Sequence, residues 1–452
     1  MAQRGQGGQK KYKIPDSPIA QDQDALDRRS RHHCIFPVYH KLLYHHNSGD
    51  VIGLISALNR TSNPLMHNAS ASLSSSAESS TFRSFSQDVA QHPELYGPTH
   101  VTILPTYRCT AACAQCCFES SPHLSGQIPI ERILAYIDEA AASFPTLKLV
   151  IFSGGECFLL REDLDKAISR VSQHGLMSRC VTNGYWAASP RAAESRAAVL
   201  KQAGLTEINF STGADHQRFV PFDRVAMGAA ATAEAGIRTI IAIEGYKESK
   251  FTVDTALQHP RIKEFLESSP VRGNLSFFSN IWIPFKSDAA ISQDPSLNRL
   301  SSKNVSPEGC DNVLENLVIT PHERVSSCCG LTFEHIPEMK LGMAREKSLK
   351  ELYFNQFDDF IKIWLRVEGP ERILQFAASK NLKIAFSTEF THPCQSCVEI
   401  FRNPEVRNAL RGSYQEKIHD VIFRYKMMIN LRDRSRPRRT PDPKSPQVGF
   451  GA

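Results

Sequence analysis

Three cysteines in one short stretch of the chain have the spacing of an iron–sulfur site. Cys109, Cys113 and Cys116 form the pattern C-x-x-x-C-x-x-C. Cysteine thiolates hold iron–sulfur clusters, and closely spaced cysteines of one loop can bind several irons of one cubane. Because a [4Fe–4S] cluster has four irons and the pattern has three cysteines, one iron stays open to a substrate or cofactor. Catalytic zinc sites keep a free position by the same logic.

Two alternatives concern the same stretch. A zinc site would use two-residue spacings in paired sets, and the three-residue gap between Cys109 and Cys113 fits that pattern poorly. Cys117 directly follows Cys116 and would replace it as a ligand if the spacing were interpreted differently. The three-then-two spacing favours Cys116, and we predict a catalytic cluster at this loop.

A second group of cysteines lies much later in the chain. Cys394 and Cys397 form a C-x-x-C pair, and Cys328 and Cys329 follow a stretch at 317–327 that predicts a β-hairpin. With Cys310, they could hold a second metal centre, either an iron–sulfur cluster or a structural zinc ion. The adjacent pair leaves open which of Cys328 and Cys329 is the ligand.

Short strands alternating with helices are predicted around the first cysteine loop. Apolar runs predict strands at 101–104, 147–152, 179–182, 207–211, 238–243 and 275–283. Helical spacing predicts helices at 130–141, 164–171, 190–203, 223–235 and 260–267, with a further one at 348–360. Alternation of this kind implies parallel strands joined by right-handed crossovers, which an open sheet and an incomplete barrel both satisfy.

Composition limits the class of protein. With 452 residues, 41% apolar residues, 22% charged residues and a net charge of +6, two or more ordinary globular domains are expected. No apolar run is long enough to span a bilayer and no signal peptide is apparent, so we expect a cytoplasmic protein without a membrane partner. Thiols stay reduced there, so 12 cysteines indicate metal binding rather than disulfides.

With its triad directly after the first predicted strand, the chain resembles the radical S-adenosylmethionine superfamily over about residues 100–290. The resemblance implies an α/β fold, a partial (β/α)6 TIM-like barrel. It also implies that the open iron is chelated by the amino and carboxylate groups of S-adenosylmethionine. Electron transfer from the reduced cluster then gives a 5′-deoxyadenosyl radical that abstracts a substrate hydrogen.

Polar residues after the next strands match the cofactor site of the same superfamily. The resemblance implies that Gly154, Gly155 and Glu156 bind the amino group of S-adenosylmethionine, and that Asn183 and Ser211 also contact the cofactor. Active sites of β/α barrels are built at this face, where the strands end. Asp215 is predicted to cap the following helix, with His216 and Glu244 as further candidates near the substrate.

The later cysteines resemble the auxiliary-cluster extension called SPASM, or its shorter relative, the twitch domain. A full SPASM domain has further cysteines after its C-x-x-C pair, and none follows Cys397. The resemblance therefore implies one auxiliary [4Fe–4S] cluster. Its expected ligands are Cys310, Cys328, Cys394 and Cys397, while Cys34, Cys157 and Cys180 are expected to be inert.

We therefore predict four parts: an N-terminal extension at 1–97, partly disordered with a Ser-rich linker at 69–86; the barrel at 98–295; the auxiliary domain at 296–405; and a C-terminal helix with a basic, disordered tail at 406–452. The expected substrate is a peptide or protein side chain that is oxidised, for example by crosslinking. There are two alternatives to a peptide-modifying enzyme: a radical enzyme that acts on a small metabolite, and a non-catalytic iron–sulfur or zinc scaffold. An electron donor such as flavodoxin or ferredoxin is expected, and nucleic acid is not.

Overall fold

A single nine-stranded sheet forms the centre of the fold in a computed structural model. The structure describes residues 74–281, 283, 309–330, 333–384 and 390–434, so the predictions for residues 1–73 and for the basic tail lie outside the described residues. The strand order is β6-β5-β4-β3-β2-β1-β7-β8-β9. The first six strands are β1 (His100–Ile103), β2 (Leu149–Phe152), β3 (Met177–Thr182), β4 (Glu207–Gly213), β5 (Arg238–Gly245) and β6 (Leu275–Ile281).

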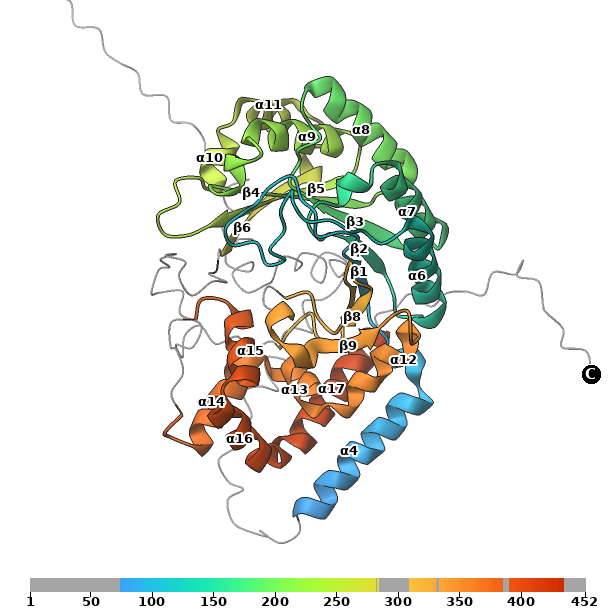
Figure 1. The fold of residues 1–452 in the computed structure, drawn as a ribbon, viewed down its shortest axis with the longest axis vertical. Coiled ribbons are helices and arrows are strands. Elements are labelled where there is room, and N and C mark those ends of the chain that lie inside the picture. Colours follow the sequence, from blue (N-terminus) through green and yellow to red (C-terminus); the bar gives the residue numbers. More distant parts are fainter. Residues whose placement is uncertain (1–73, 282, 284–308, 331–332, 385–389, 435–452) are drawn as a thin grey trace, which may run out of the picture.

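These six strands are parallel and adjacent in chain order, as the alternating pattern predicts. The connecting helices are α6 (Ile130–Ser143), α7 (Glu162–Gln173), α8 (Pro190–Ala203), α9 (Phe222–Glu234), α10 (Val253–Leu257) and α11 (Pro260–Ser268). Figure 1 shows these helices along the outer side of a curved sheet. The sheet does not close, because β6 and β9 lie at its two edges. The prediction of a partial (β/α)6 barrel is confirmed.

Local sequence signals set the helix boundaries. At the start of α8, the Ser189 side chain accepts a hydrogen bond from the Ala192 amide, and Pro190 occupies the first turn. The helix ends at Gly204, whose φ of 92° lies in the left-handed region that glycine adopts readily. Such boundaries define where the chain turns toward the next strand, and the parallel pairing puts the strand ends on one side of the sheet.

The sheet continues past β1 into the second half of the chain. Strand β7 (Asn316–Ile319) pairs in parallel with β1, and β8 (Arg324–Ser326) and β9 (Lys340–Met343) follow it antiparallel. The predicted hairpin is therefore present. It is also joined to the barrel sheet, because β7 pairs with β1, which the sequence pattern did not reveal.

Helices of the C-terminal half surround this extension of the sheet. They are α12 (Leu349–Phe354), α13 (Phe360–Glu368), α14 (Pro370–Lys380), α15 (Pro393–Arg402), α16 (Pro404–Ser413) and α17 (Gln415–Arg434). The helix predicted at 348–360 is shorter than expected, since it gives way to a 3₁₀ turn at Asn355–Asp358, after which Asp359 caps a second helix. The predicted C-terminal helix is present as α17, which contacts both α13 and α4. No helix in the described ranges has the length and apolarity needed to cross a bilayer.

The Ser-rich linker prediction requires a correction. Residues Ser74–Gln91 form helix α4, followed by the short helix α5 (Pro93–Tyr96). Phe85 is fully buried, with its ring edge-to-face against Tyr96 and Tyr425 at 5.9 Å. Burial of these aromatic rings outweighs the weak helix preference of serine. This part of the extension belongs to the core.

Candidate functional site

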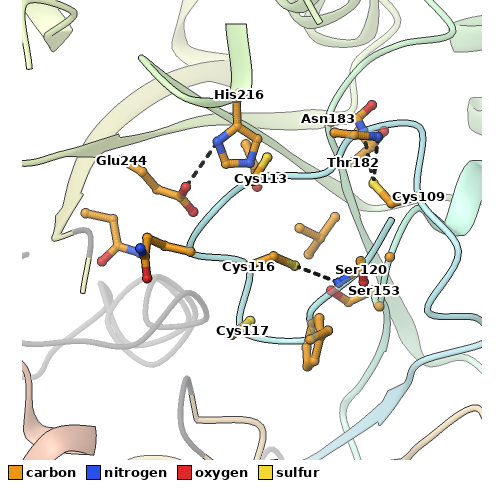
Figure 2. Close-up of a pocket in the computed structure, with 18 of the residues that line it drawn as sticks. Cys109, Cys113, Cys116, Cys117, Ser120, Ser153, Thr182, Asn183, His216 and Glu244 are labelled. Carbon is orange, nitrogen blue, oxygen red and sulfur yellow. Dashed lines mark hydrogen bonds and ion pairs between the residues drawn. The ribbon is translucent and has the colours of Figure 1, made fainter. Parts of the chain in front are cut away.

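A cavity opens where the six barrel strands end (Figure 2). Each strand, or the loop directly after it, contributes to the wall. The lining includes Cys109, Cys113, Cys116, Ser153, Gly154, Gly155, Asn183, Ser211, His216, Glu244 and Asn280. Residues that are far apart in sequence meet there because parallel strands end on the same side. The first cysteine triad therefore faces residues from β2 to β6 across one space.

Backbone hydrogen bonds shape the loop that carries the triad. The Cys109 amide donates to the Ser121 carbonyl at 3.1 Å, and the Cys116 amide donates to Cys113 at 3.2 Å. Two amides point at sulfur: Ala111 donates to Cys109 Sγ and Ser120 donates to Cys116 Sγ, both at 3.4 Å. Donors of this kind stabilise thiolates and tune the potential of iron–sulfur clusters.

Gly154 and Gly155 bring the end of β2 into backbone contact with the cysteine loop. The Gly155 amide donates to the Thr106 carbonyl at 2.8 Å. A Cβ on Gly155 would lie 2.2 Å from the Arg108 carbonyl oxygen, and one on Gly154 would lie 2.5 Å from that of Thr106. Gly154 also has a φ of 104°. The paired glycines therefore allow this strand end to approach the loop that holds the cysteines, as well as to line the cavity.

Glu156 lies behind the cavity wall rather than in it. Its fully buried carboxylate accepts hydrogen bonds from the Asn183 amide at 2.8 Å, the Thr182 hydroxyl at 2.9 Å and the Phe158 amide at 3.1 Å. Burial raises the pKa of Glu156 to about 7, although these hydrogen bonds oppose the shift. Glu156 is not among the residues that line the cavity. Its hydrogen bonds to Thr182 and Asn183 instead join the ends of β2 and β3.

Asn183 links that junction to the triad (Figure 2). Its side-chain amide donates to the Thr110 hydroxyl at 2.9 Å and to Cys109 Sγ at 3.5 Å, while its oxygen accepts from the Tyr185 amide at 3.0 Å. The amide side chain is thus held at both ends. Asn183 therefore orients Cys109 at the wall of the cavity.

Cys109 is buried, Cys113 and Cys116 are half-buried, and the three thiols lie close to one another. Burial raises the pKa of Cys109 to about 12, and the nearby carboxylate of Glu156 adds to the shift. Burial also raises the pKa of Cys113, to which Glu244 and Asp215 contribute. Metal binding requires deprotonated thiols, so iron would have to displace these protons. Three thiols on one loop, with amides directed at two of the sulfurs, fit a cubane with one open iron.

Asp215 does not cap a helix, contrary to the prediction. Its carboxylate accepts a hydrogen bond from the Ala114 amide of the cysteine loop at 2.8 Å and pairs with Arg218 at 2.9 Å. The loop after β4 is therefore tied to the loop after β1. This contact brings His216 to the cavity wall, facing Glu244.

His216 and Glu244 form a pair on the β4–β6 side of the cavity (Figure 2). His216 Nδ1 lies 3.2 Å from Glu244 Oε2. Burial lowers the pKa of His216 to about 4 and, with Asp215, raises that of Glu244 to about 8. Burial therefore favours the neutral form of both groups. The sequence pattern gave only a weak sign of Glu244 and missed Asn280, although both come at strand ends.

The second cysteine group gathers around the end of β8 and the start of α15. A Cβ on Gly330 would lie 3.0 Å from Cys394 Sγ and 3.7 Å from Cys328 Sγ, so these two sulfurs are neighbours. Burial raises the pKa of Cys397, and Cys328, Cys310 and Cys394 are close enough to add to the shift. Within the described residues, no three Cys, His, Asp or Glu side chains converge on a point suited to one metal ion.

Cys329 differs from its neighbour Cys328. Its sulfur donates to Asn312 Oδ1 at 3.0 Å and accepts from Asn316 Nδ2 at 2.9 Å. Cys329 also lines the first cavity, together with Cys117. Cys117 in turn packs beside Ile283 and Cys394 of the second group. The two cysteine groups are therefore separated by a thin wall that contains further thiols.

Comparisons with known proteins identify the barrel region. Residues 103–257 match a family model described as the radical SAM superfamily. A putative peptide biosynthesis protein, YydG of Bacillus subtilis (strain 168), is 27% identical over 126 residues. That match covers 28% of this chain and 39% of the relative, so the alignment spans less than half of YydG.

Two solved structures are among the matches. Native anSMEcpe with bound AdoMet and Cp18Cys peptide is 16% identical with a TM-score of 0.43, and the match covers 70% of this chain and 99% of that one. SuiB of Streptococcus suis bound to S-adenosylmethionine is 15% identical with a TM-score of 0.47, covering 69% of this chain and 81% of that one.

Replacing Gly155 with alanine should remove the iron of the first cysteine loop. The added Cβ overlaps the Arg108 carbonyl oxygen, so the loop must move and its three sulfurs lose their arrangement. We expect Gly155→Ala to lower bound iron by about four atoms per chain after anaerobic reconstitution. Gly245→Ala is the control, because its Cβ meets nothing within 4 Å. Full iron content in Gly155→Ala would contradict the role of this contact.

Proposed function

Because residues 103–257 match the radical SAM superfamily model, we propose that the protein is an enzyme that cleaves S-adenosylmethionine reductively and abstracts a hydrogen atom from its substrate. When bound, the reduced [4Fe–4S] cluster and S-adenosylmethionine supply the 5′-deoxyadenosyl radical for this step. The observation that carries the proposal is the triad of thiols in the wall of a cavity at the strand ends. The chain's own residues bind, orient and enclose the reactants.

Cys109, Cys113 and Cys116 hold the catalytic cluster in this proposal. Amide hydrogen bonds reach the sulfurs of Cys109 and Cys116. Cys117 instead packs toward Ile283 and Cys394, on the side of the second cysteine group. These contacts favour Cys116 over Cys117 as the third ligand.

The β2–β4 side of the cavity binds S-adenosylmethionine in this proposal. Gly154 and Gly155 present backbone atoms to the cavity, and Asn183 and Ser211 present polar side chains. Glu156 contributes by fixing Asn183 through its backbone amide. Direct binding of the cofactor's ammonium group by Glu156 would require the carboxylate to leave its present hydrogen bonds. A rigid wall here would keep the cofactor oriented toward the substrate, and such orientation raises the rate of the reaction.

The β4–β6 side remains for the substrate. His216, Glu244 and Asn280 line it, opposite the glycine pair. This wall therefore offers both hydrogen-bond donors and hydrogen-bond acceptors, which suit a polar substrate such as a peptide backbone or side chain. The resemblance to YydG, a putative peptide biosynthesis protein, also supports a peptide. We propose oxidative modification of a peptide or protein side chain, for example a crosslink.

An auxiliary [4Fe–4S] cluster bound by Cys310, Cys328, Cys394 and Cys397 completes the proposed enzyme. The neighbouring sulfurs of Cys328 and Cys394 support it, as does the proximity of the other three thiols to Cys397, whose pKa they raise. The two asparagines that hold Cys329 favour Cys328 as the ligand. Such a cluster can accept the electron that an oxidised substrate leaves, and a flavodoxin or ferredoxin would reduce the catalytic cluster.

A cytoplasmic location is part of the same proposal. The described cysteines are free thiols, and many of them are proposed cluster ligands. Both features suit a reducing compartment.

Replacement of the triad tests the radical chemistry. We expect Cys109→Ala, Cys113→Ala and Cys116→Ala each to lose about four irons per chain and all formation of 5′-deoxyadenosine with dithionite and S-adenosylmethionine, since each removes a cluster ligand. Cys117→Ala should keep both. Loss of iron in Cys117→Ala, with retention in Cys116→Ala, would reverse the ligand assignment.

Replacement of the later cysteines tests the auxiliary cluster. Alanine at Cys310, Cys328, Cys394 or Cys397 should lower iron by about four atoms per chain and leave the iron of the first loop in place. Cys329→Ala should keep the iron of the intact protein. Metal analysis that finds zinc instead of iron in this half of the protein would contradict the auxiliary cluster.

Co-expression with a short peptide encoded beside the gene tests the substrate class. We expect the mass of the peptide to fall by about two hydrogen atoms, since a crosslink removes two hydrogens and two electrons. The Cys116→Ala variant is the matched control and should leave the mass unchanged. An unchanged mass with the intact enzyme, alongside active cleavage of S-adenosylmethionine, would contradict a peptide substrate and leave the radical chemistry standing.

A further inference from the structure

The segment 309–316, which we call the Cys310 segment, lies directly against the end of helix α13. The Cys310 amide donates to the Leu365 carbonyl at 2.8 Å. A Cβ on Gly309 would lie 1.9 Å from the Arg366 carbonyl oxygen, so the segment approaches the helix at backbone distance. Arg366 Nη1 also lies 3.5 Å from the Cys310 carbonyl oxygen. The position of Cys310 therefore depends on how this segment is fastened.

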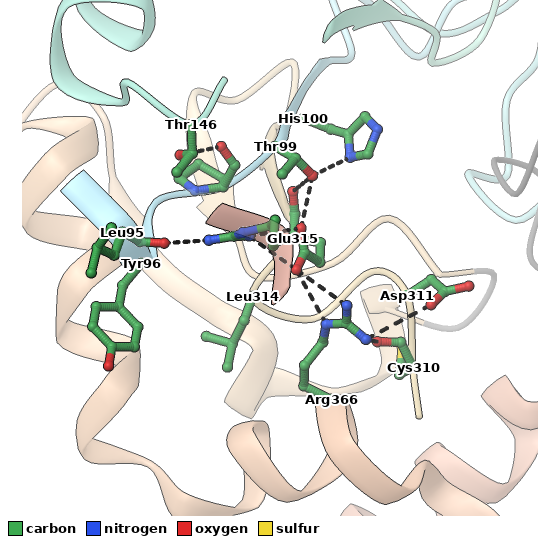
Figure 3. A network of polar contacts seen from close by, with 12 residues as sticks. Leu95, Tyr96, Thr99, His100, Thr146, Cys310, Asp311, Leu314, Glu315 and Arg366 are labelled. Carbon is green, nitrogen blue, oxygen red and sulfur yellow. Dashed lines mark hydrogen bonds and ion pairs between the residues drawn. The ribbon is translucent and has the colours of Figure 1, made fainter. Parts of the chain in front are cut away.

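Glu315 is the main fastening point of the segment (Figure 3). Only 3% of its surface is exposed, and its carboxylate accepts hydrogen bonds from Thr99 Oγ1 at 2.8 Å, Arg432 Nη1 at 3.1 Å and Arg366 Nη2 at 3.2 Å. Its carbonyl oxygen accepts from the Thr99 and His100 amides, both at 3.0 Å. One residue thus joins the Cys310 segment to β1, α13 and α17.

Charge in this network is balanced. Arg366 and Arg432 face the carboxylates of Glu315 and Asp311, the latter 3.8 Å from Arg366. Burial alone would lower the pKa of each arginine, but Glu315 raises it, so both guanidinium groups stay charged. Two cations thus face two anions in this network, and Asp311 adds to the upward shift of the Cys310 pKa that burial causes. The network also acts on the position of Cys310, through the backbone contacts of the segment with α13.

The same segment also engages Cys329, whose sulfur lies near the other thiols of the second cysteine group but is taken up by side-chain amides. Asn312 and Asn316 belong to the segment, and both are hydrogen-bonded to Cys329 Sγ. The Glu315 and Asn316 amides both donate to the Asn312 carbonyl, at 3.1 and 2.9 Å. Movement of the segment would therefore displace Cys310 and release Cys329 together.

We propose that Glu315 is a positioning residue for the auxiliary cluster, which keeps Cys310 in place as a ligand and Cys329 out of the ligand set. This inference rests on the auxiliary cluster of the proposed function. Because Arg432 of helix α17 donates to Glu315, the C-terminal helix is also part of the proposed auxiliary-cluster site. Partners of metal ligands set ligand orientation in this way, and their loss weakens metal binding.

Glu368 provides a matched control inside the same structure. It is 5% exposed and accepts hydrogen bonds from Trp364 Nε1 at 2.6 Å and Arg424 Nη1 at 2.8 Å, with Lys417 Nζ at 3.4 Å. It therefore joins α13 to α17 through a buried carboxylate, as Glu315 does. None of its hydrogen bonds or ion pairs in the described residues reaches the Cys310 segment.

The test uses the full chain with Cys109→Ala, Cys113→Ala and Cys116→Ala, so that bound iron reports the auxiliary cluster alone. Glu315→Gln, Thr99→Val and Glu368→Gln are added singly, and iron release to a chelator is followed with thermal unfolding. We expect Glu315→Gln to release iron about tenfold faster than the parent and Glu368→Gln to stay within about twofold, although both lower the melting temperature. Thr99→Val removes the hydroxyl that contacts Glu315 and His100 but keeps both arginine contacts of Glu315, so its release rate should fall between them.

Equal release from the Glu315→Gln and Glu368→Gln variants would overturn the proposal. If Glu315→Gln does not fold, the comparison of Thr99→Val with Glu368→Gln decides it, and equal release from these two would also overturn it. Absence of iron from the parent with the three alanines would refute the auxiliary cluster and this inference with it. If the parent holds iron and the Glu315→Gln and Thr99→Val variants release it at the parent's rate, the inference is refuted and the auxiliary cluster stands.

Discussion

Backbone contact between the cysteine loop and the end of β2 is the constraint on which the site depends. A side chain on Gly155 would overlap the Arg108 carbonyl oxygen at 2.2 Å, so this approach is open only to glycine. The contact fixes the loop that carries the triad against the strand edge. From there, Glu156 joins β2 to β3, and Asn183 reaches back to Cys109. The sulfur positions are thus determined by neighbouring strand ends as well as by the loop itself.

The second half of the protein depends on the same sheet. Strand β7 extends the barrel sheet beyond β1, which brings the later cysteines next to the first cavity. Glu315 then fastens the Cys310 segment to β1 and to two C-terminal helices. Cys117 and Cys329 lie between the two cysteine groups. In the proposed enzyme, this arrangement puts the auxiliary cluster within short reach of the substrate.

The sequence pattern predicted those features that depend on local periodicity and spacing. The six barrel strands follow from short apolar runs, and the first cysteine loop follows from spacing alone. The pairing of β7 with β1 was not predictable, because long-range strand pairing leaves no local periodicity. Helix α4 was missed because its stability comes from the burial of Phe85 against residues more than ten positions away, including Tyr425.

Side-chain partners across loops were equally hidden. Asp215 has the sequence position of a helix cap, yet it binds the Ala114 amide because the loops after β1 and β4 meet in space. Glu156 has the position of a ligand contact, yet its carboxylate is taken up by Thr182 and Asn183. In both cases the competing partner comes from another strand end, and only the fold reveals it.

The most direct test of the account is the electron paramagnetic resonance spectrum of the dithionite-reduced protein, recorded with and without S-adenosylmethionine. If the triad holds a cluster whose open iron faces the cavity, the cofactor binds that iron and the spectrum changes. The Cys116→Ala variant should show no such change. A fully reconstituted, reduced protein whose spectrum is the same with and without S-adenosylmethionine would contradict the account.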